Sequence, residues 1–273
     1  MPGPASPTCM TEPGPTGGPR CGGPLTYTTQ ERAILAQKNL LAQEALAVRS
    51  GKLSPATFAR DWQAFMRKYG GPTTGRNRAR GPQPTCAGSC DTSLYINLTQ
   101  QAQTTNYYCG PATAAEALGV RNIWVSQSTL AGNSYLQTNE YGGTNWGSLV
   151  MPSTLNAWTN SYFYEAIDAN STNTYTVYES DLYADIGEGW SVILAVQEEK
   201  NAGPHLVGHP TNIVINHWVA SYGYTEYGGN TAYADSVHGA GSIPWNSSVP
   251  AYSTISSYNM WVMMSQGTFG WVW

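Results

Sequence analysis

The spacing of apolar residues predicts two amphipathic helices in the first quarter of the chain. The first begins after a threonine cap at Thr28 or Thr29 and ends at Gly51, and the second begins at Ser54-Pro55. Helices this short form a hairpin that buries its apolar face only against another part of the protein. The apolar faces comprise Ile34, Leu35, Leu40, Leu41, Ala45, Leu46, Val48, Phe58, Trp62, Phe65 and Met66.

From Cys86 onward the pattern predicts one compact α+β domain, with helices first and an antiparallel sheet second. A turn at 228–230 joins the last two strands into a hairpin. The predicted helices lie at the alanine-rich stretch from Cys109 to Leu118, at 126–130, over the segment with Trp146, Leu149, Leu155 and Trp158, and at 181–187. The predicted strands lie at 162–166, 190–196, 213–224 and 231–236.

The chain divides into four segments by composition. We expect residues 1–27, which are rich in Pro and Gly, to lack regular structure, and residues 28–69 to form the basic hairpin. Residues 70–85 are interpreted as a flexible basic linker and a site for proteolytic nicking, and residues 86–273 as the compact domain. The basic cluster in the linker is Arg76, Arg78 and Arg80.

The formal net charge of −4 conceals two oppositely charged parts. Residues 1–85 hold 11 of the 13 Lys and Arg and 4 of the 17 Asp and Glu, so they carry +7, while residues 86–273 carry −11. We expect the basic hairpin to contact the acidic domain within the molecule. The acidic domain argues against a nucleic-acid partner, and no apolar run is long enough to predict a membrane span.

The five cysteines favour an oxidising compartment. Cys9 and Cys21 flank a Pro/Gly-rich stretch, and Cys86 and Cys90 close a tight loop, so two local disulfides would leave Cys109 as the odd thiol. The alternative is that these four are reduced or bind metal, although the four histidines lie far downstream of them. We therefore expect a secreted protein whose signal peptide is not part of this chain, and the sequence gives no sign of a metal or cofactor.

Cys109 is the candidate nucleophile. It stands where a loop turns into a helix, and the unsatisfied N–H groups of a helix N-terminus favour the thiolate, the nucleophilic form. Pro111 suits the first helical turn. The alternative interpretation is a buried structural cysteine, which is common for a free thiol.

His217 is the best candidate for the base, because it starts an apolar strand that would aim it. Asp235, in the partner strand of the hairpin, is expected near it and would fix its tautomer. His205 and His209 lie in a Gly/Pro-rich loop that would hold an imidazole poorly, at the rim of a cleft or in solvent. Gln103, six residues before the cysteine, would donate to an oxyanion, although spacing alone does not choose it over Gln100 and Gln101.

Four pieces of the sequence, in order, resemble the papain-like peptidases related to the bacteriocin-leader (double-glycine) processing domain. These are Gln103 with Tyr107-Tyr108-Cys109-Gly110-Pro111-Ala112, then Gly189-Trp190-Ser191-Val192-Ile193-Leu194, then His217-Trp218-Val219-Ala220-Ser221-Tyr222-Gly223-Tyr224, then Tyr233-Ala234-Asp235-Ser236. The resemblance implies a papain-like fold and a triad of Cys109, His217 and Asp235, with Gln103 in the oxyanion hole. Without transporter segments, the leader-processing and export role does not carry over.

The sequence therefore predicts a secreted papain-like cysteine peptidase that acts on a peptide or protein substrate, with residues 28–69 as a propeptide-like cover. Two alternatives stay open. One is an acyl transferase, a transpeptidase or a transglutaminase-like enzyme, that hands the same acyl-enzyme to an amine. The other is a non-catalytic module that binds peptide or glycan on its aromatic surface. The substrate, the cleavage preference and the oligomeric state are not evident from the sequence.

Overall fold

The structure is a computed structural model that describes residues 25–70 and 92–273. Cys9, Cys21, Cys86 and Cys90, and with them both predicted disulfides, lie outside the described residues. So do most of the predicted 1–27 segment and of the 70–85 linker. The two predicted helices of the hairpin lie within the described residues.

Both helices begin where the capping signals predict. Helix α1 (Thr29–Arg49) has Thr28 as its N-cap, in a reciprocal capping box with Glu31. Helix α2 (Pro55–Tyr69) has Ser54 as its N-cap, and the Ser54 side chain accepts from the main-chain N–H of Thr57. The proline at the first helical position lacks an N–H that the helix would not have used.

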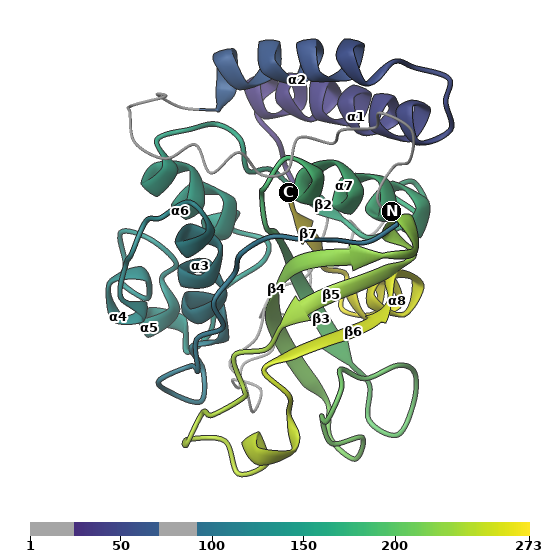
Figure 1. Ribbon diagram of the computed structural model, residues 1–273. Coiled ribbons are helices and arrows are strands. Elements are labelled where there is room, and N and C mark those ends of the chain that lie inside the picture. The colour runs from purple at the N-terminus through teal and green to yellow at the C-terminus, as the bar shows by residue number, and fades with distance from the viewer. Residues whose placement is uncertain (1–24, 71–91) are drawn as a thin grey trace, which may run out of the picture.

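The hairpin packs on the rest of the chain through buried aromatic residues and one buried lysine. Trp62 and Phe65 make edge contacts with the ring of Phe163, at centroid distances of 6.1 and 6.3 Å. Figure 1 shows the hairpin as a layer over helix α7 (Tyr175–Gly187). Lys38 on α1 is also fully buried. The apolar pattern of the sequence did not predict it as part of the buried face.

The strands form one seven-stranded sheet in the order β2-β7-β3-β4-β5-β6, with β1 paired to β4. Every pairing is antiparallel. The longest strand, β4, lies between β3 and β5 and is buried along nearly all its length, so its side chains are held on rigid backbone. The strands are β1 (Leu94–Tyr95), β2 (Ala166–Asp168), β3 (Val192–Glu198), β4 (Ile215–Thr225), β5 (Asn230–Ala234), β6 (Tyr252–Ser256) and β7 (Gly270–Val272).

Helices lie on both sides of this sheet. Figure 1 shows α3, α4, α5 and α6 gathered on one side of the strands and α8 on the other. The molecule is therefore α+β, as the order of the sequence elements predicts. The helices are α3 (Cys109–Val120), α4 (Gln127–Leu130), α5 (Thr138–Tyr141), α6 (Val150–Thr159) and α8 (Ser257–Gln266), and two short 3₁₀ turns lie at Glu226–Gly228 and Asn246–Ser248.

Several predicted boundaries are wrong. The helix with Trp146 begins only at Val150, because Leu149 adopts a left-handed conformation with φ 56°. Of the strand predicted at 162–166, only Ala166 belongs to β2. Helix α7 begins six residues earlier than predicted, at Tyr175. The sequence analysis did not predict α5, α8, β6 or a strand in the aromatic tail.

No helix within residues 25–70 and 92–273 is both long and apolar enough to cross a membrane.

Candidate active site

Cys109 is the first residue of α3, as predicted, and its side chain is fully buried. It is a free thiol. The Thr113 hydroxyl, one turn further along, donates to the main-chain carbonyl of Trp218 at 3.0 Å and ties α3 to β4. This contact fixes the start of the helix against the strand that carries His217.

His217 and Asp235 meet, as the sequence predicts. Nε2 of His217 lies 3.0 Å from Oδ1 of Asp235, and both side chains are buried. The same carboxylate oxygen accepts from the main-chain N–H of Val237 at 2.9 Å. Asp235 directly follows the last residue of β5, so the strand pairing of β4 with β5 brings the two residues together.

The other ring nitrogen of His217 is left for Cys109. Nδ1 is buried without a hydrogen-bond partner among the described residues, and Cys109 lies close enough to the ring to raise the pKa of His217. Burial disfavours the imidazolium, but the charge and hydrogen bond of Asp235, with a smaller contribution from Cys109, outweigh it. Together these raise the pKa of His217 to about 9. The imidazolium is thus the favoured form at neutral pH.

His209 is buried against Asp235, which corrects the prediction that its loop would hold it poorly. Its Nε2 lies 3.0 Å from Oδ2 of Asp235, the carboxylate oxygen that His217 does not use. Its Nδ1 lies 2.6 Å from Oε1 of Glu198, the last residue of β3. Sequence reasoning missed this residue because neither neighbour is local to its glycine-rich loop.

Glu198 closes the loop of residues 199–212 onto the sheet. Its second oxygen, Oε2, lies 3.0 Å from Nδ1 of His205 and accepts from the main-chain N–H of Leu206 at 3.2 Å. The side chain of Glu198 is fully buried. A run of hydrogen-bonded pairs therefore leads from His205 through Glu198, His209 and Asp235 to His217.

Asp235 is held strongly ionised at the centre of this run. Burial raises the pKa of a carboxyl group, but the adjacent His217 and His209, by charge and by hydrogen bonds, hold the pKa of Asp235 well below its ordinary value. Burial of His209 is likewise outweighed by Asp235 and Glu198, which raise its pKa to about 10. The ionised Asp235 therefore lies between two histidines whose charged form it favours.

Gln103 is buried beside the segment that carries Asp235. Its main-chain N–H donates to the carbonyl of Ser236 at 2.8 Å, and its Oε1 accepts from the Ser236 hydroxyl at 3.1 Å. The amide nitrogen donates to the carbonyl of Thr105 at 2.8 Å. The oxygen end of the amide thus faces Ser236, and the nitrogen end faces the loop that leads to Cys109.

Two neighbours fix the loop around Gln103, and spacing alone did not identify them. Gln127 acts as a clamp, because its amide accepts from the N–H of Thr104 and donates to the carbonyl of Ala102. Glu116 on α3 accepts from the N–H of Gln101 at 2.8 Å. Burial raises the pKa of Glu116 well above its ordinary value.

Gln100 takes a different role from Gln103. Its amide nitrogen lies 2.9 Å from the carbonyl of Asp235 and 3.1 Å from that of His238. It therefore holds the chain that follows β5 rather than facing the loop before Cys109. The contacts of Gln100 thus differ from those of Gln103.

His209, His217 and Asp235 are also close enough to one another to share a metal ion, and no other such group occurs among the described residues. Each histidine nitrogen lies 3.0 Å from its carboxylate oxygen, which is a hydrogen-bonding distance. The two histidines therefore bind the carboxylate itself.

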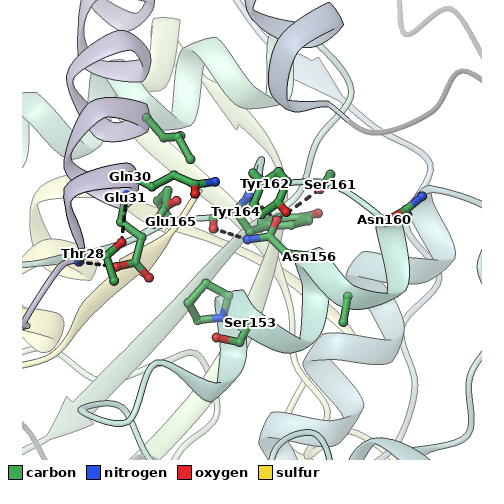
Figure 2. Close-up of a pocket in the computed structure, with 13 residues that line it drawn as sticks. Thr28, Gln30, Glu31, Ser153, Asn156, Asn160, Ser161, Tyr162, Tyr164 and Glu165 are labelled. Carbon is green, nitrogen blue, oxygen red and sulfur yellow. Dashed lines mark hydrogen bonds between the residues drawn. The ribbon is translucent and has the colours of Figure 1, made fainter.

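A pocket of about 440 Å³ lies elsewhere, between the start of α1, helix α6 and the segment 160–165. Figure 2 shows Glu31 and Glu165 on one side of it and Asn156 and Ser153 on the other. Burial, with the charge of Glu31, raises the pKa of Glu165 to about 8. The pocket is lined by neither Cys109 nor His217, so it is separate from the candidate active site.

The Peptidase_C39 like family matches residues 94–265, which is more than half of the chain and includes Cys109, Gln103, His217 and Asp235. The chain belongs to the Peptidase_C39 like family. It is accordingly a papain-like cysteine peptidase, a hydrolase. No curated protein and no solved structure matches it.

Proposed function

We propose that this member of the Peptidase_C39 like family hydrolyses peptide bonds with Cys109 as the nucleophile, His217 as the proton-transfer group and Asp235 as its orienting partner. The observation that carries the proposal is the position of His217 between the other two side chains. Nε2 is bound to Asp235 at 3.0 Å, and Cys109 lies close enough to the ring to raise the pKa of His217. A carboxylate on one nitrogen presents the other nitrogen to the thiol in a single tautomer.

The reaction follows from the charges of these groups. The thiolate of Cys109 attacks the carbonyl carbon, a C–S bond forms, and the carbonyl oxygen gains negative charge. The imidazolium of His217 then gives its proton to the leaving amine as the C–N bond breaks, which leaves a thioester on Cys109. Water attacks the thioester, loses a proton to His217, and releases the acid and the free thiolate.

Gln103 is proposed to donate to the developing oxyanion, together with the main-chain N–H of Cys109. In support, hydrogen bonds with Ser236 and Thr105 hold both ends of the Gln103 amide. Gln127 and Glu116 brace the loop on either side of it. A donor held in this way costs little reorganisation when charge appears on the substrate.

The papain-like arrangement is part of the same proposal, with α3 as the nucleophile helix packed on the antiparallel sheet. The bond from Thr113 to the carbonyl of Trp218 supports it, because it joins the helix to the strand of the base. The positive end of the α3 dipole favours an anionic sulfur at Cys109.

Secretion, the two disulfides and a role for residues 28–69 in maturation remain proposals. The odd cysteine count and the polar, uncharged composition support the first two. Contact between the basic hairpin and the acidic domain is supported by the ion pairs Lys38–Asp185 and Arg49–Glu179, each at 3.4 Å. These contacts lie on the α7 side of the sheet, so a restraint by the hairpin would act through that face.

The proposed function is tested by digesting a peptide library with the wild-type chain and with Cys109→Ala, and by weighing the products. Hydrolysis products from the wild type alone support the proposal. Adding an amine tests whether water or the amine accepts the acyl group. Amide products that form in place of the acid would identify an acyl transferase. Peptide cleavage that survives in Cys109→Ala would overturn the assignment of the nucleophile.

A further inference from the structure

We propose that His209 is a positioning residue of the active site, which holds the second oxygen of Asp235 and divides the charge of that carboxylate between two imidazoles. The proposal rests on the proposed function, because it gives His209 a task in tuning His217. It extends the site from three side chains to five, with Glu198 as the outer carboxylate.

Between two ionised carboxylates, the hydrogen bonds of His209 need a proton on each of its ring nitrogens. Its Nε2 faces Oδ2 of Asp235 at 3.0 Å and its Nδ1 faces Oε1 of Glu198 at 2.6 Å. A neutral imidazole has one N–H, whereas ionised carboxylates only accept, so both bonds form only when both nitrogens carry protons. The buried His209 is therefore an imidazolium clamped between two anions, and its raised pKa agrees with that geometry. His217 differs, because a carboxylate occupies only one of its nitrogens.

The fold fixes the position of this imidazolium from three directions. Glu198 reaches it from the end of β3, and Asp235 reaches it from the end of β5. The ring of Trp245 packs against it edge to face at 4.7 Å between centroids. Gly208, the residue before His209, accepts a hydrogen bond from the hydroxyl of Ser248 at its main-chain carbonyl. The glycine-rich loop is thus held by contacts with distant segments, which suits a precise electrostatic role.

The positive charge of His209 acts on His217 in two ways. The two ring centroids are 5.5 Å apart, so like charge repels the His217 imidazolium directly. His209 also withdraws part of the negative charge of Asp235 that would otherwise stabilise His217. Both effects lower the pKa of His217 from the higher value that Asp235 alone would impose. His217 then gives its proton more readily to the leaving amine.

The other ionisable groups around this pair do not supply a competing charge. Burial raises the pKa of Tyr233, so it is neutral at pH 7, and burial also raises the pKa of Glu116. His205 contacts Glu198 on the side away from Asp235. Cys109 also contributes to the pKa of His217, and less than Asp235 does.

The test compares His209→Gln with the wild type in the full chain, from pH 5 to pH 11. Glutamine can place an amide N–H toward Asp235 but carries no charge. We expect the alkaline limb of kcat/KM to move upward by about one pH unit or more, with kcat about tenfold lower and KM within about twofold. His238→Gln is the matched control, since the His238 ring contacts the carbonyl of Val249 and not Asp235. It should leave the pH profile unchanged.

Glu198→Gln provides a second variant if His209→Gln does not fold. Glutamine at position 198 favours the protonated form of His209 less than glutamate does. The alkaline limb of kcat/KM should therefore also move upward, by a smaller amount than in His209→Gln. An unchanged alkaline limb in a folded variant, with only a lowered melting temperature, would show a purely structural role and overturn the inference.

The rate of Cys109 alkylation by iodoacetamide against pH gives a readout that needs no substrate. A shift of this profile in His209→Gln supports the coupling even when no peptide is cleaved, whereas an unshifted profile sinks it. Absence of cleavage by the wild type would count against the proposed function and not against His209.

Discussion

Oδ1 of Asp235 lies 3.0 Å from Nε2 of His217, although 18 positions separate the two residues along the chain. The contact exists because β4 and β5 pair across a short turn and Asp235 directly follows β5. Asp235 also accepts from the N–H of Val237 and from His209, so its carboxylate is fixed in orientation. The hydrogen bond to this carboxylate in turn orients the ring of His217.

Asp235→Asn should lower kcat by at least about 100-fold with a small change in KM. The amide has the same shape but cannot stabilise the imidazolium, and it can hold His217 in the wrong tautomer. Peptide hydrolysis at saturating substrate measures the effect. Asp61→Asn, on the hairpin, is the control, because Asp61 pairs only with its neighbour Arg60 in the described structure. Equal activity of Asp235→Asn and wild type would remove Asp235 from the triad.

The pH dependence of the wild type should show an alkaline limb near pH 9. The pKa of His217 is raised to about 9, so the proton that it gives to the leaving amine is present below that pH and lost above it. We expect kcat/KM to halve near pH 9 and to continue falling. A limb near pH 6.5, the ordinary value for histidine, would contradict the buried pairing with Asp235.

Gln103→Ala should lower kcat by about 100- to 1,000-fold and change KM little, because the donor acts on charge that appears in the transition state. Gln103→Glu should be at least as damaging, since a carboxylate repels an oxyanion. Gln63→Ala, exposed on α2, is the control. If Gln100→Ala loses more activity through kcat than Gln103→Ala, the oxyanion role belongs elsewhere.

Gly110→Ala should destabilise the protein by about 1–3 kcal/mol and lower its activity. A methyl group at Gly110 would come within 2.1 Å of the Thr144 hydroxyl oxygen, and Gly110 directly follows the proposed nucleophile, Cys109. Gly187→Ala is the matched control, because a methyl group at Gly187 in α7 meets nothing within 4 Å. Urea denaturation and peptide hydrolysis measure both variants. Equal stability of the two variants would argue against the close approach of Gly110 to Thr144.

Lys38→Ala should lower the free energy of unfolding by about 3–5 kcal/mol, because it leaves the buried carboxylate of Asp185 without its partner. The ammonium group also lies 3.2 Å from the carbonyl of Phe163 and 3.8 Å from the centroid of its ring. Lys52→Ala, exposed after α1, is the control. Adding Asp185→Asn to Lys38→Met should restore part of the loss, as both charges are then absent. A loss below about 1 kcal/mol would mean that Lys38 does not anchor the hairpin.

Which elements could be predicted from the sequence depended on how far apart in the chain their interacting residues lie. Helix starts at Thr28, Ser54 and Cys109 were predictable, because caps and first-turn residues act within a few positions. The start of α6 was not predictable, because it depends on the left-handed backbone conformation of Leu149. Leucine rarely adopts that conformation unless tertiary contacts impose it. The missed strand β7 is paired with β2 and β3, which lie far away in the sequence.

The sequence by itself predicted the place of Cys109 at a helix start, the contact between His217 and Asp235, and the order of helices before sheet. Each of these was carried by a local pattern: a cysteine at a helix start, a histidine in an apolar strand, an aspartate across a hairpin. Only the tertiary structure decided that His209 is buried on Asp235 and that Lys38 is buried on Asp185. The physical reason is that burial of a charge requires a partner from elsewhere in the chain. Composition and periodicity do not show which distant segment supplies that partner.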